Sequence, residues 1–447
     1  MSAETSAWSG PTITPLRAEE LKDAWDVLSA GERLEGLRLL TWTEAEELIQ
    51  ALETRDQTEL FLAAPPQEAR TWMRLLPPDD TADVIQEAPI EDRPRLLGLL
   101  DDSTRKEVVA LLAYAEDDAG GLMNPRYVRL RPEMSVDEAT SYLRRQAREH
   151  AETLYYVYVL DPDQKLLGVI TFRDLLIAPP ERRVRDVMRT DVVVAEEEMD
   201  QEALSALFAE HNFIAIPVVD KDRRMKGIVT VDDIVDVVRE EATEDIQKIG
   251  GMEALDAPYL DVSFRQMVRK RAGWLSALFI GEMFTATAMG YFEREIARAV
   301  VLALFVPLII SSGGNSGSQA STLVIRAMAL QELRLRDWWR VVRREIAAGL
   351  SLGAILATIG LVRILAWQAL FGLYGDHYLL IAITVAASLI GVVMWGTLVG
   401  ATLPMLLTRL GFDPASASAP FVATLVDVSG IVIYFTVGSV VLGGTLL

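Results

Sequence analysis

The chain has 447 residues, of which 51% are hydrophobic and 24% are charged, and its formal net charge is −21. The charge lies in one half: up to Arg271 there are 33 Lys and Arg against 55 Asp and Glu, whereas 10 stand against 9 thereafter. This composition predicts an acidic water-soluble half followed by a membrane half, which disfavours a nucleic-acid partner and favours cations. Without Cys there is no disulfide and no thiolate chemistry.

Residues 1–120 are expected to form an α-helical domain in the cytoplasm. The first residues lack the basic and apolar regions of a secretory signal peptide. From about Leu16 to Tyr114, apolar residues recur at helical spacing, and short acidic or Pro-containing segments such as LLPPDDTADVIQ begin successive helices. The pattern predicts a short helical superhelix, which could be a plain adaptor or a binding domain.

Residues 121–238 contain an internal duplication. The segment LMNPRYVRLRPEMSVDEATSYL, from Leu122, has a counterpart VMRTDVVVAEEEMDQEALSALF, from Val187. Each copy predicts a strand, a helix, two short β-branched strands joined by an acidic turn, and a second helix. The copies resemble tandem CBS domains of α+β fold, with the nucleotide motif of that family at residues 168–174 and again at 227–233.

The motif has a physical use in binding a nucleotide. Its Asp accepts hydrogen bonds from ribose hydroxyl groups, while Thr and the helix N-terminus face phosphate. Many CBS copies bind no nucleotide, so a purely structural pair is the alternative. The residues expected to bind an adenosine nucleotide such as ATP are Tyr156, Arg173, Asp174 and Phe213.

Residues 239–270 are expected to form an acidic connecting helix and a linker. The sequence VVREEATEDIQKIGGMEALDAP predicts a helix that continues from the second copy to Gly250. Acidic residues recur along one face of this helix, namely Asp233, Asp236, Glu240, Glu241, Glu244 and Asp245. Like charges three and four residues apart repel, so such a helix requires cations unless it is simply a solvated surface.

Residues 271–447 are expected to form an all-α transmembrane domain of five helices. Crossing about 30 Å of hydrocarbon takes roughly 20 apolar residues. Five stretches reach that length, at about 272–291, 300–325, 346–372, 378–407 and 420–446. Basic residues precede the first stretch and crowd the connection after the second, which places the acidic half in the cytoplasm. Such long apolar runs disfavour the alternative, a soluble enzyme with five buried helices.

The second expected span carries residues that a simple anchor would lack. Pro307 and the segment GGNSGSQ interrupt its apolar pattern. Non-helical backbone at this depth must be buried in protein or line a wet cavity, so the segment is expected to line a pore. Close helix packing through small residues is the alternative. The expected pore-lining residues are Gly313, Gly314, Asn315, Gly317, Ser318 and Gln319.

The fifth expected span carries one ionisable residue, Asp427. A carboxylate at the bilayer centre costs about 2.5–3.5 kcal/mol on insertion scales, so it requires a partner or water. We expect Asp427 to coordinate a cation, with an ion pair or a buried hydrogen bond as the alternative. Arg363 is expected to reach the outer interface instead of pairing with it. Glu282, in the first span, is a second intramembrane acid without an assigned role.

The order of helical array, CBS pair, acidic helix and five spans resembles the MgtE family of magnesium channels and transporters over essentially the whole chain. The motifs that carry the resemblance are DDAGGLMNP at Asp117, EATEDIQKIGG at Glu241, GGNSGSQ at Gly313 and PFVATLVDVSG at Pro420. The resemblance implies a homodimer with its pore on the two-fold axis, where the carboxylate matching Asp427 binds hydrated Mg²⁺.

The resemblance also implies that cytosolic Mg²⁺ binds between the soluble domains and the connecting helix and closes the pore. The ligands that it implies are Asp79, Asp83, Glu202, Asp233, Asp236, Glu241, Glu244 and Asp245. One expected acid of the second CBS copy is replaced by Asn212. Because Mg²⁺ keeps most of its waters, one or two carboxylates suffice for each ion, and two facing copies of Asp427 would supply them.

These features predict a dimeric magnesium-selective channel of the cytoplasmic (inner) membrane, which moves Mg²⁺ into the cytosol. We expect closure by cytosolic Mg²⁺ and modulation by ATP. The alternatives are a transporter for Co²⁺ or Mn²⁺, since an oxygen-only site does not exclude these ions, and a membrane-tethered CBS sensor that transports nothing. No HExxH or P-loop lysine motif is present, which disfavours an enzyme.

Overall fold

The structure, a computed structural model, describes residues 17–146, 155–255, 257, 259–260 and 262–445. The signal-peptide prediction and the predicted start of the helical array at Leu16 lie outside these ranges. The chain divides into two units, Met1–Val238 and Arg239–Leu447, and each is considered by itself.

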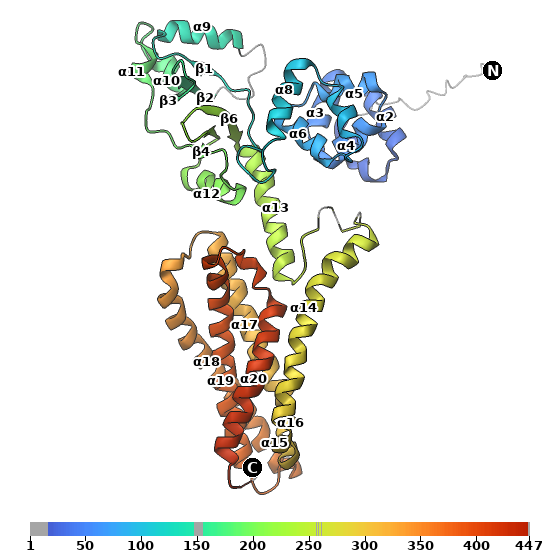
Figure 1. Ribbon diagram of the computed structural model, residues 1–447, viewed down its shortest axis with the longest axis vertical. Helices are drawn as coiled ribbons and strands as arrows, with labels where there is room; N and C mark the ends of the chain where they lie inside the picture. Colours follow the sequence, from blue (N-terminus) through green and yellow to red (C-terminus); the bar gives the residue numbers. More distant parts are fainter. Residues whose placement is uncertain (1–16, 147–154, 256, 258, 261, 446–447) are drawn as a thin grey trace, which may run out of the picture. The chain divides into compact units, whose positions relative to one another are not determined.

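The first unit begins with a run of short helices (Figure 1). They are α1 (Ala18–Asp23), the 3-10 helix η1 (Trp25–Val27), α2 (Ala30–Leu39), α3 (Trp42–Gln50), α4 (Thr54–Ala63), α5 (Pro66–Met73), α6 (Pro78–Glu87), α7 (Arg93–Leu97) and α8 (Asp102–Leu111). Several of these helices start at residues that favour a helix N-terminus. Ser29 and Thr41 form capping boxes at the start of α2 and α3, and Pro66 and Pro78 occupy the first turn of α5 and α6. The predicted helical array is confirmed.

The remainder of the first unit contains the duplicated α+β fold. Its elements are β1 (Arg129–Leu130), α9 (Val136–Gln146), β2 (Tyr156–Leu160), β3 (Leu166–Thr171), α10 (Phe172–Ile177), α11 (Val184–Val187), β4 (Ala195–Glu196), α12 (Gln201–His211), β5 (Ala215–Val219), β6 (Met225–Thr230) and α13 (Val231–Ile249). The strands form two three-stranded sheets in the orders β1-β2-β3 and β4-β5-β6, each with one parallel and one antiparallel pair. This matching topology confirms the duplication.

Equivalent glycines mark the same place in both sheets. Gly168 pairs with Val159, and Gly227 pairs with Val218. A Cβ at Gly168 would lie 2.7 Å from the carbonyl oxygen of Arg189, and one at Gly227 would lie 2.7 Å from that of Asn124. Glycine recurs here because another backbone segment crosses each sheet too closely for a side chain.

Helix α13 is continuous over 19 residues and ends at Ile249, which confirms the predicted connecting helix. The division between the two units falls within it, after Val238. The acidic residues near its start therefore belong to the first unit, and those near its end belong to the second.

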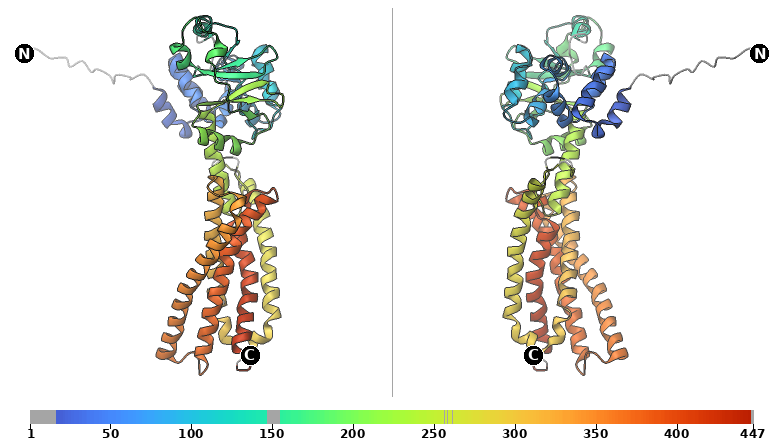
Figure 2. Two further views of the ribbon diagram at one scale, coloured as in Figure 1. Left: turned by 90° about the vertical axis from the view of Figure 1, so that its left-hand side faces the viewer. Right: turned by 90° about the vertical axis from the view of Figure 1, so that its right-hand side faces the viewer.

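The second unit is helical. Its elements are α14 (Phe264–Tyr291), α15 (Glu293–Arg298), α16 (Val300–Ala303), α17 (Val306–Ala329), η2 (Leu335–Asp337), α18 (Trp338–Phe371), α19 (Tyr378–Arg409), η3 (Pro414–Ser416) and α20 (Ala419–Leu442). Figure 2 shows its long helices running alongside one another, and α17, α19 and α20 pack pairwise.

Among the described residues, four stretches are long and apolar enough to cross a membrane: Val300–Ala329, Leu335–Phe371, Tyr378–Arg409 and Ala419–Leu442. They correspond to the second to fifth expected spans. The first expected span forms α14, which packs against α20 but is not one of the four. It is less apolar because Glu282 interrupts its hydrophobic run and basic residues occupy its first turns.

The segment GGNSGSQ, which interrupts the apolar pattern of the second span, continues the α-helix of α17 without a break. The glycines serve close packing. A Cβ at Gly313 would lie 2.5 Å from Cγ1 of Val392, and one at Gly317 would lie 2.8 Å from Cγ1 of Val422. On α19, Gly396 and Gly400 abut the carbonyl oxygens of Gly313 and Gly317. Small residues on both helices therefore let α17 and α19 approach closely.

Candidate functional site

A hollow of about 310 Å³ lies between α17 and α20. Its lining residues are Pro307, Ile310, Ser311, Gly314, Asn315, Ala423 and Asp427. Asp427 is the one ionisable residue in this lining. A Cβ on Gly314 would lie 3.8 Å from Oδ1 of Asp427, so the missing side chain leaves room beside the carboxylate. The result is a small recess, lined mainly by apolar groups, that holds one carboxylate on a membrane-length helix.

Polar residues continue along the exposed face of α17. Ser311, Asn315 and Gln319 follow one another at intervals of four residues, and all three are exposed. Ser312 satisfies its hydroxyl within the helix by donating to the carbonyl oxygen of Leu308, at 2.6 Å. Asn315 donates a long, 3.5 Å hydrogen bond to the hydroxyl of Ser311 one turn earlier. An amide group has further donor and acceptor positions, so this face requires water or another polar surface at membrane depth.

The six expected pore-lining residues thus fall on different sides of α17. Gly314 and Asn315 line the hollow, and Gln319 lies one turn further along the exposed face. Gly313 and Gly317 lie in the contacts with α19 and α20. Ser318 donates a 3.1 Å hydrogen bond to the carbonyl oxygen of Ala419 and so connects α17 with the start of α20.

Glu282 contacts the carboxyl group of Asp427. The two side chains hydrogen-bond, and both are half-buried. The neighbouring Gly281 brings the two helices together, because a Cβ there would lie 2.8 Å from Cγ2 of Thr424 on α20. Sequence analysis found no role for Glu282, since its partner lies more than a hundred residues further along the chain.

Arg363 lies elsewhere, as expected. Its guanidinium group stacks 3.6 Å from the ring centroid of Trp367 and donates a 3.0 Å hydrogen bond to the hydroxyl of Tyr374. It therefore belongs to the end of α18 and the following connection, and does not neutralise Asp427.

A second group of acids lies where α6 meets the start of α13. It consists of Asp80, Asp232, Asp233 and Asp236, and we name it the α6–α13 cluster. Burial and, to a smaller extent, the charges of Asp232 and Asp236 together raise the pKa of Asp80 to about 6. Burial likewise raises the pKa of Asp233 to about 7, against the lowering effect of a 2.7 Å hydrogen bond from the hydroxyl of Thr230. These carboxyl groups bind protons unusually well because their charges are crowded and poorly solvated.

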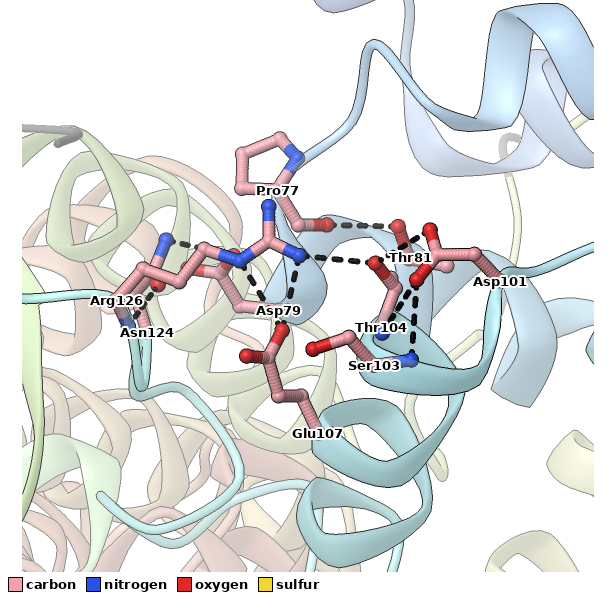
Figure 3. A network of polar contacts seen from close by, with 9 residues as sticks. All are labelled: Pro77, Asp79, Thr81, Asp101, Ser103, Thr104, Glu107, Asn124 and Arg126. Atoms are coloured by element: carbon pink, nitrogen blue, oxygen red, sulfur yellow. Dashed lines mark hydrogen bonds and ion pairs between the residues drawn. The ribbon is translucent and has the colours of Figure 1, made fainter. Parts of the chain in front are cut away.

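The sequence prediction chose Asp79 and Asp83 from α6 and overlooked Asp80. Asp79 is turned inward, where its carboxylate accepts a 3.1 Å hydrogen bond from Nδ2 of Asn124 (Figure 3). Beside it, Arg126 donates to Glu107 and to the hydroxyl of Thr104, both at 2.9 Å. This network fastens the helical array to the segment that precedes β1.

Two further predicted ligands differ in their exposure. Asp83 is half-buried on α6, and Glu202 is exposed in the first turn of α12. Asn212, which stands in place of an expected acid, ends α12 in the left-handed conformation with φ of 54°. Asn tolerates this conformation better than most residues, which gives a local reason for its presence.

The last turns of α13 carry a third group, within the second unit. Lys248 makes ion pairs with Glu244 and, at 2.7 Å, with Asp413 in the loop before α20. Burial and, to a smaller extent, the charges of Asp413 and Glu241 together raise the pKa of Asp245 to about 6. Lys248 and Asp413 are not among the residues predicted from the sequence. Their ion pair means that a lysine of the chain itself neutralises part of this acidic face.

The candidate nucleotide-binding residues come from both CBS copies. Tyr156 of β2 makes an edge-to-face contact with Phe213, which follows α12, with ring centroids 6.5 Å apart. Asp174 forms a 3.2 Å ion pair with Arg189, and Arg173 is exposed on α10. The structure therefore brings the two aromatic residues together, while the Asp already has a cationic partner.

Within the residues that the structure describes, no three acidic or His side chains converge closely enough to hold a metal ion. The acidic groups are thus pairs and looser clusters and not complete cages. Mg²⁺ is nevertheless compatible with few protein ligands, because it retains several of its waters.

Comparison with known proteins gives consistent matches along the chain. Residues 306–437 match the MgtE family model, described as a divalent cation transporter, residues 16–117 match the MgtE intracellular N domain, and residues 119–181 and 184–240 match CBS domains. The magnesium transporter MgtE of Thermus thermophilus is 41% identical over 433 residues, which cover 96% of this chain and 94% of that protein.

Two other known proteins are similar to this chain. The magnesium transporter MgtE of Bacillus subtilis is 32% identical over 403 residues, which cover 90% of this chain and 87% of that protein. A crystal structure of the cytosolic domain of the Mg²⁺ channel MgtE in complex with ATP is 42% identical, with a TM-score of 0.47, and the match covers 49% of this chain and 90% of that one.

Proposed function

The chain belongs to the MgtE family of magnesium transporters, and on this basis we propose that it is a homodimeric channel that passes Mg²⁺ into the cytosol. It is a membrane transporter and not an enzyme. Its location in the cytoplasmic membrane, with the first unit in the cytoplasm, is part of the proposal and rests on the distribution of basic residues.

The observation that carries the proposal is the position of Asp427 at a hollow beside the polar face of α17. A carboxylate and exposed amides on membrane-length helices require a polar surface opposite them. A second copy of the chain, related by a two-fold axis, would supply the same surface and a second Asp427. Two carboxylates and the oxygen of Asn315 could then hold a Mg²⁺ ion that keeps most of its water shell.

The acidic groups of α6 and α13 support closure of this channel by cytosolic Mg²⁺. Two carboxylates 4 Å apart repel by about 4 kcal/mol at an effective dielectric constant near 20, and a divalent ion removes that repulsion. Mg²⁺ would therefore favour the arrangement in which the acids are close, in proportion to its preference for that arrangement. The proposed ligands are Asp83, Glu202, Asp233, Asp236, Glu241, Glu244 and Asp245, to which the contacts described above add Asp80 and Asp413. Asp79, which the resemblance also implies, is instead engaged by the amide of Asn124.

Modulation by a nucleotide such as ATP is the finer part of the proposal. The contact between Tyr156 and Phe213 supports it, because an adenine ring could insert beside these aromatic side chains. Asp174 would have to exchange Arg189 for a ribose hydroxyl, which predicts that the Arg189→Ala substitution changes nucleotide affinity.

Flux measured with the purified full-length protein in liposomes tests the central proposal. Wild-type protein should pass Mg²⁺, and Asp427→Asn should reduce the flux by at least tenfold while the protein remains folded and dimeric. Asp376→Asn, in the exposed connection between α18 and α19, removes an acid outside the hollow and should transport normally. Absence of wild-type flux above empty vesicles would favour a sensor that transports nothing, and equal flux of Co²⁺ or Mn²⁺ would contradict magnesium selectivity.

A further inference from the structure

Glu282 is a half-buried acid of the second unit to which the proposed channel assigns no task. It lies on α14 and hydrogen-bonds to Asp427 of α20, yet it does not line the hollow. Gly281 and Thr424 pack closely at the same level of the two helices. The contact between the acids is therefore set by the packing of two helices and not by a chance approach of long, mobile side chains.

A hydrogen bond from Glu282 can fix the orientation of the Asp427 carboxyl group. A hydrogen bond between two carboxyl groups uses the O–H of one and an oxygen of the other. It fixes the plane and direction of the Asp427 carboxyl group, which would otherwise rotate freely at the edge of the hollow. Partners that hydrogen-bond to an ion ligand commonly orient it, and their removal typically weakens ion binding by about 10–100-fold.

We propose that Glu282 is a positioning residue for the ion site, which holds the carboxyl group of Asp427 in the orientation that faces Gly314 and Asn315. The inference rests on the proposed function, in which Asp427 binds the permeating ion. Glu282 acts through Asp427 and does not itself contact Mg²⁺.

Three substitutions separate this role from that of a direct ligand. Glu282→Gln keeps the length of the side chain and a hydrogen-bond donor, so the concentration of Mg²⁺ at half-maximal flux should stay within about threefold of wild type. Glu282→Leu removes the hydrogen bond and should raise that concentration by about tenfold or more. Glu282→Asp keeps the acid but shortens it by one methylene, so it should resemble the Leu variant.

The measurement is Mg²⁺ flux against Mg²⁺ concentration for the full-length protein in liposomes, with thermal unfolding recorded for each variant. Glu345→Leu removes another half-buried acid of the second unit, whose charged neighbour is Arg344, and serves as the matched control. Its half-maximal concentration should not change. The Asp variant keeps the comparison informative if the Leu variant does not fold.

Each outcome bears on the inference. A positioning role is supported if Glu282→Gln keeps the wild-type affinity for Mg²⁺ while Glu282→Leu or Glu282→Asp weakens it. An equal loss of Mg²⁺ affinity in Glu282→Gln and Glu282→Leu would overturn the inference, because Glu282 would then act as an anionic ligand. Unchanged affinity in Leu and Asp would also overturn it, although Asp427 could still be the ion ligand. Absence of flux in the wild-type protein, in contrast, would overturn the proposed function itself.

Discussion

The ammonium group of Lys248, one residue before the end of α13, lies 2.7 Å from the carboxylate of Asp413 in the loop before α20. It also pairs with Glu244, so one cation joins two acids of the second unit. Lys248 thereby fastens the end of α13 without any metal ion. Because it already neutralises part of the acidic face, it reduces the charge that a bound cation would have to neutralise.

Replacing Lys248 by Met should therefore make the attachment of α13 depend more strongly on Mg²⁺. Without the ammonium group, Glu244 and Asp413 repel at low Mg²⁺, and proteolysis of the connection between α13 and α14 should become several times faster. Millimolar Mg²⁺ should restore the wild-type rate. Lys221→Met breaks an exposed ion pair with Glu198 and is the matched control. Equal proteolysis of the two variants at low Mg²⁺ would exclude the fastening role of Lys248.

The α6–α13 cluster should make the first unit less stable as pH rises. The pKa values of Asp80 and Asp233 are raised to about 6 and about 7 from an ordinary value near 4. The folded state thus binds more protons than the unfolded state, so the stabilisation is full below about pH 4 and is lost as pH rises through about 6–7. Without Mg²⁺, the unfolding temperature should fall over this range.

Calorimetry of the full-length protein at several pH values measures this effect. Mg²⁺ at neutral pH should restore the lost stability, because it neutralises the same carboxylates. The Asp80→Asn variant should show a flatter pH dependence, whereas Asp191→Asn, an exposed acid outside the cluster, should keep the wild-type profile. Identical profiles for wild type and Asp80→Asn would contradict the assignment of the titration to this cluster.

Asp79 should matter for folding more than for the response to Mg²⁺. Its buried carboxylate satisfies the amide of Asn124, and removing one partner of a buried hydrogen bond costs about 1–3 kcal/mol. Asp79→Ala should therefore lower the stability of the first unit by this amount, at low and at high Mg²⁺ alike. Asp83→Ala, on the same helix but half-buried, is the comparison. A loss of stability that appears only with Mg²⁺ would identify Asp79 as a regulatory ligand instead.

The neighbouring residues Asp79 and Asp80 show which features of the fold the sequence predicts and which it does not. Helical periodicity and the duplicated strand pattern were sufficient to predict the helical array, the two CBS copies and the apolar spans, because these patterns depend on local spacing. The choice between Asp79 and Asp80 depends on the rotation of α6 by about 100° per residue against its neighbours. That rotation is set by packing against α4 and α8, so the sequence of α6 alone could not decide it.

The same limit explains the open alternatives and omissions in the membrane half. Pore lining and close helix packing were both open for Gly313 and Gly317, because their packing partners Gly396 and Gly400 stand about eighty residues later in the sequence. The contact between Glu282 and Asp427 depends on the packing of α14 against α20, which the sequence of either helix does not specify. Asp427 was recognised in advance because a carboxylate in an apolar run is unusual in itself, whatever surrounds it.

The glycine contact between α17 and α19 gives a final prediction. Gly396 faces the carbonyl oxygen of Gly313 so closely that a methyl group there would force the helices apart. Gly391, on the same helix, has its nearest neighbour at 3.4 Å, an ordinary contact with Cγ2 of Ile433. Gly396→Ala should therefore destabilise the second unit by about 1–3 kcal/mol, the usual cost of overpacking, whereas Gly391→Ala should have little effect.

Unfolding of the two variants in mixed detergent micelles measures the difference directly. Because α17 also carries Gly314 and Asn315 at the hollow, displacement of this helix by Gly396→Ala should reduce Mg²⁺ flux as well as stability. Gly391→Ala should retain both. If Gly396→Ala were as stable and as active as Gly391→Ala, the close approach of α17 and α19 would not be what places the hollow beside Asp427.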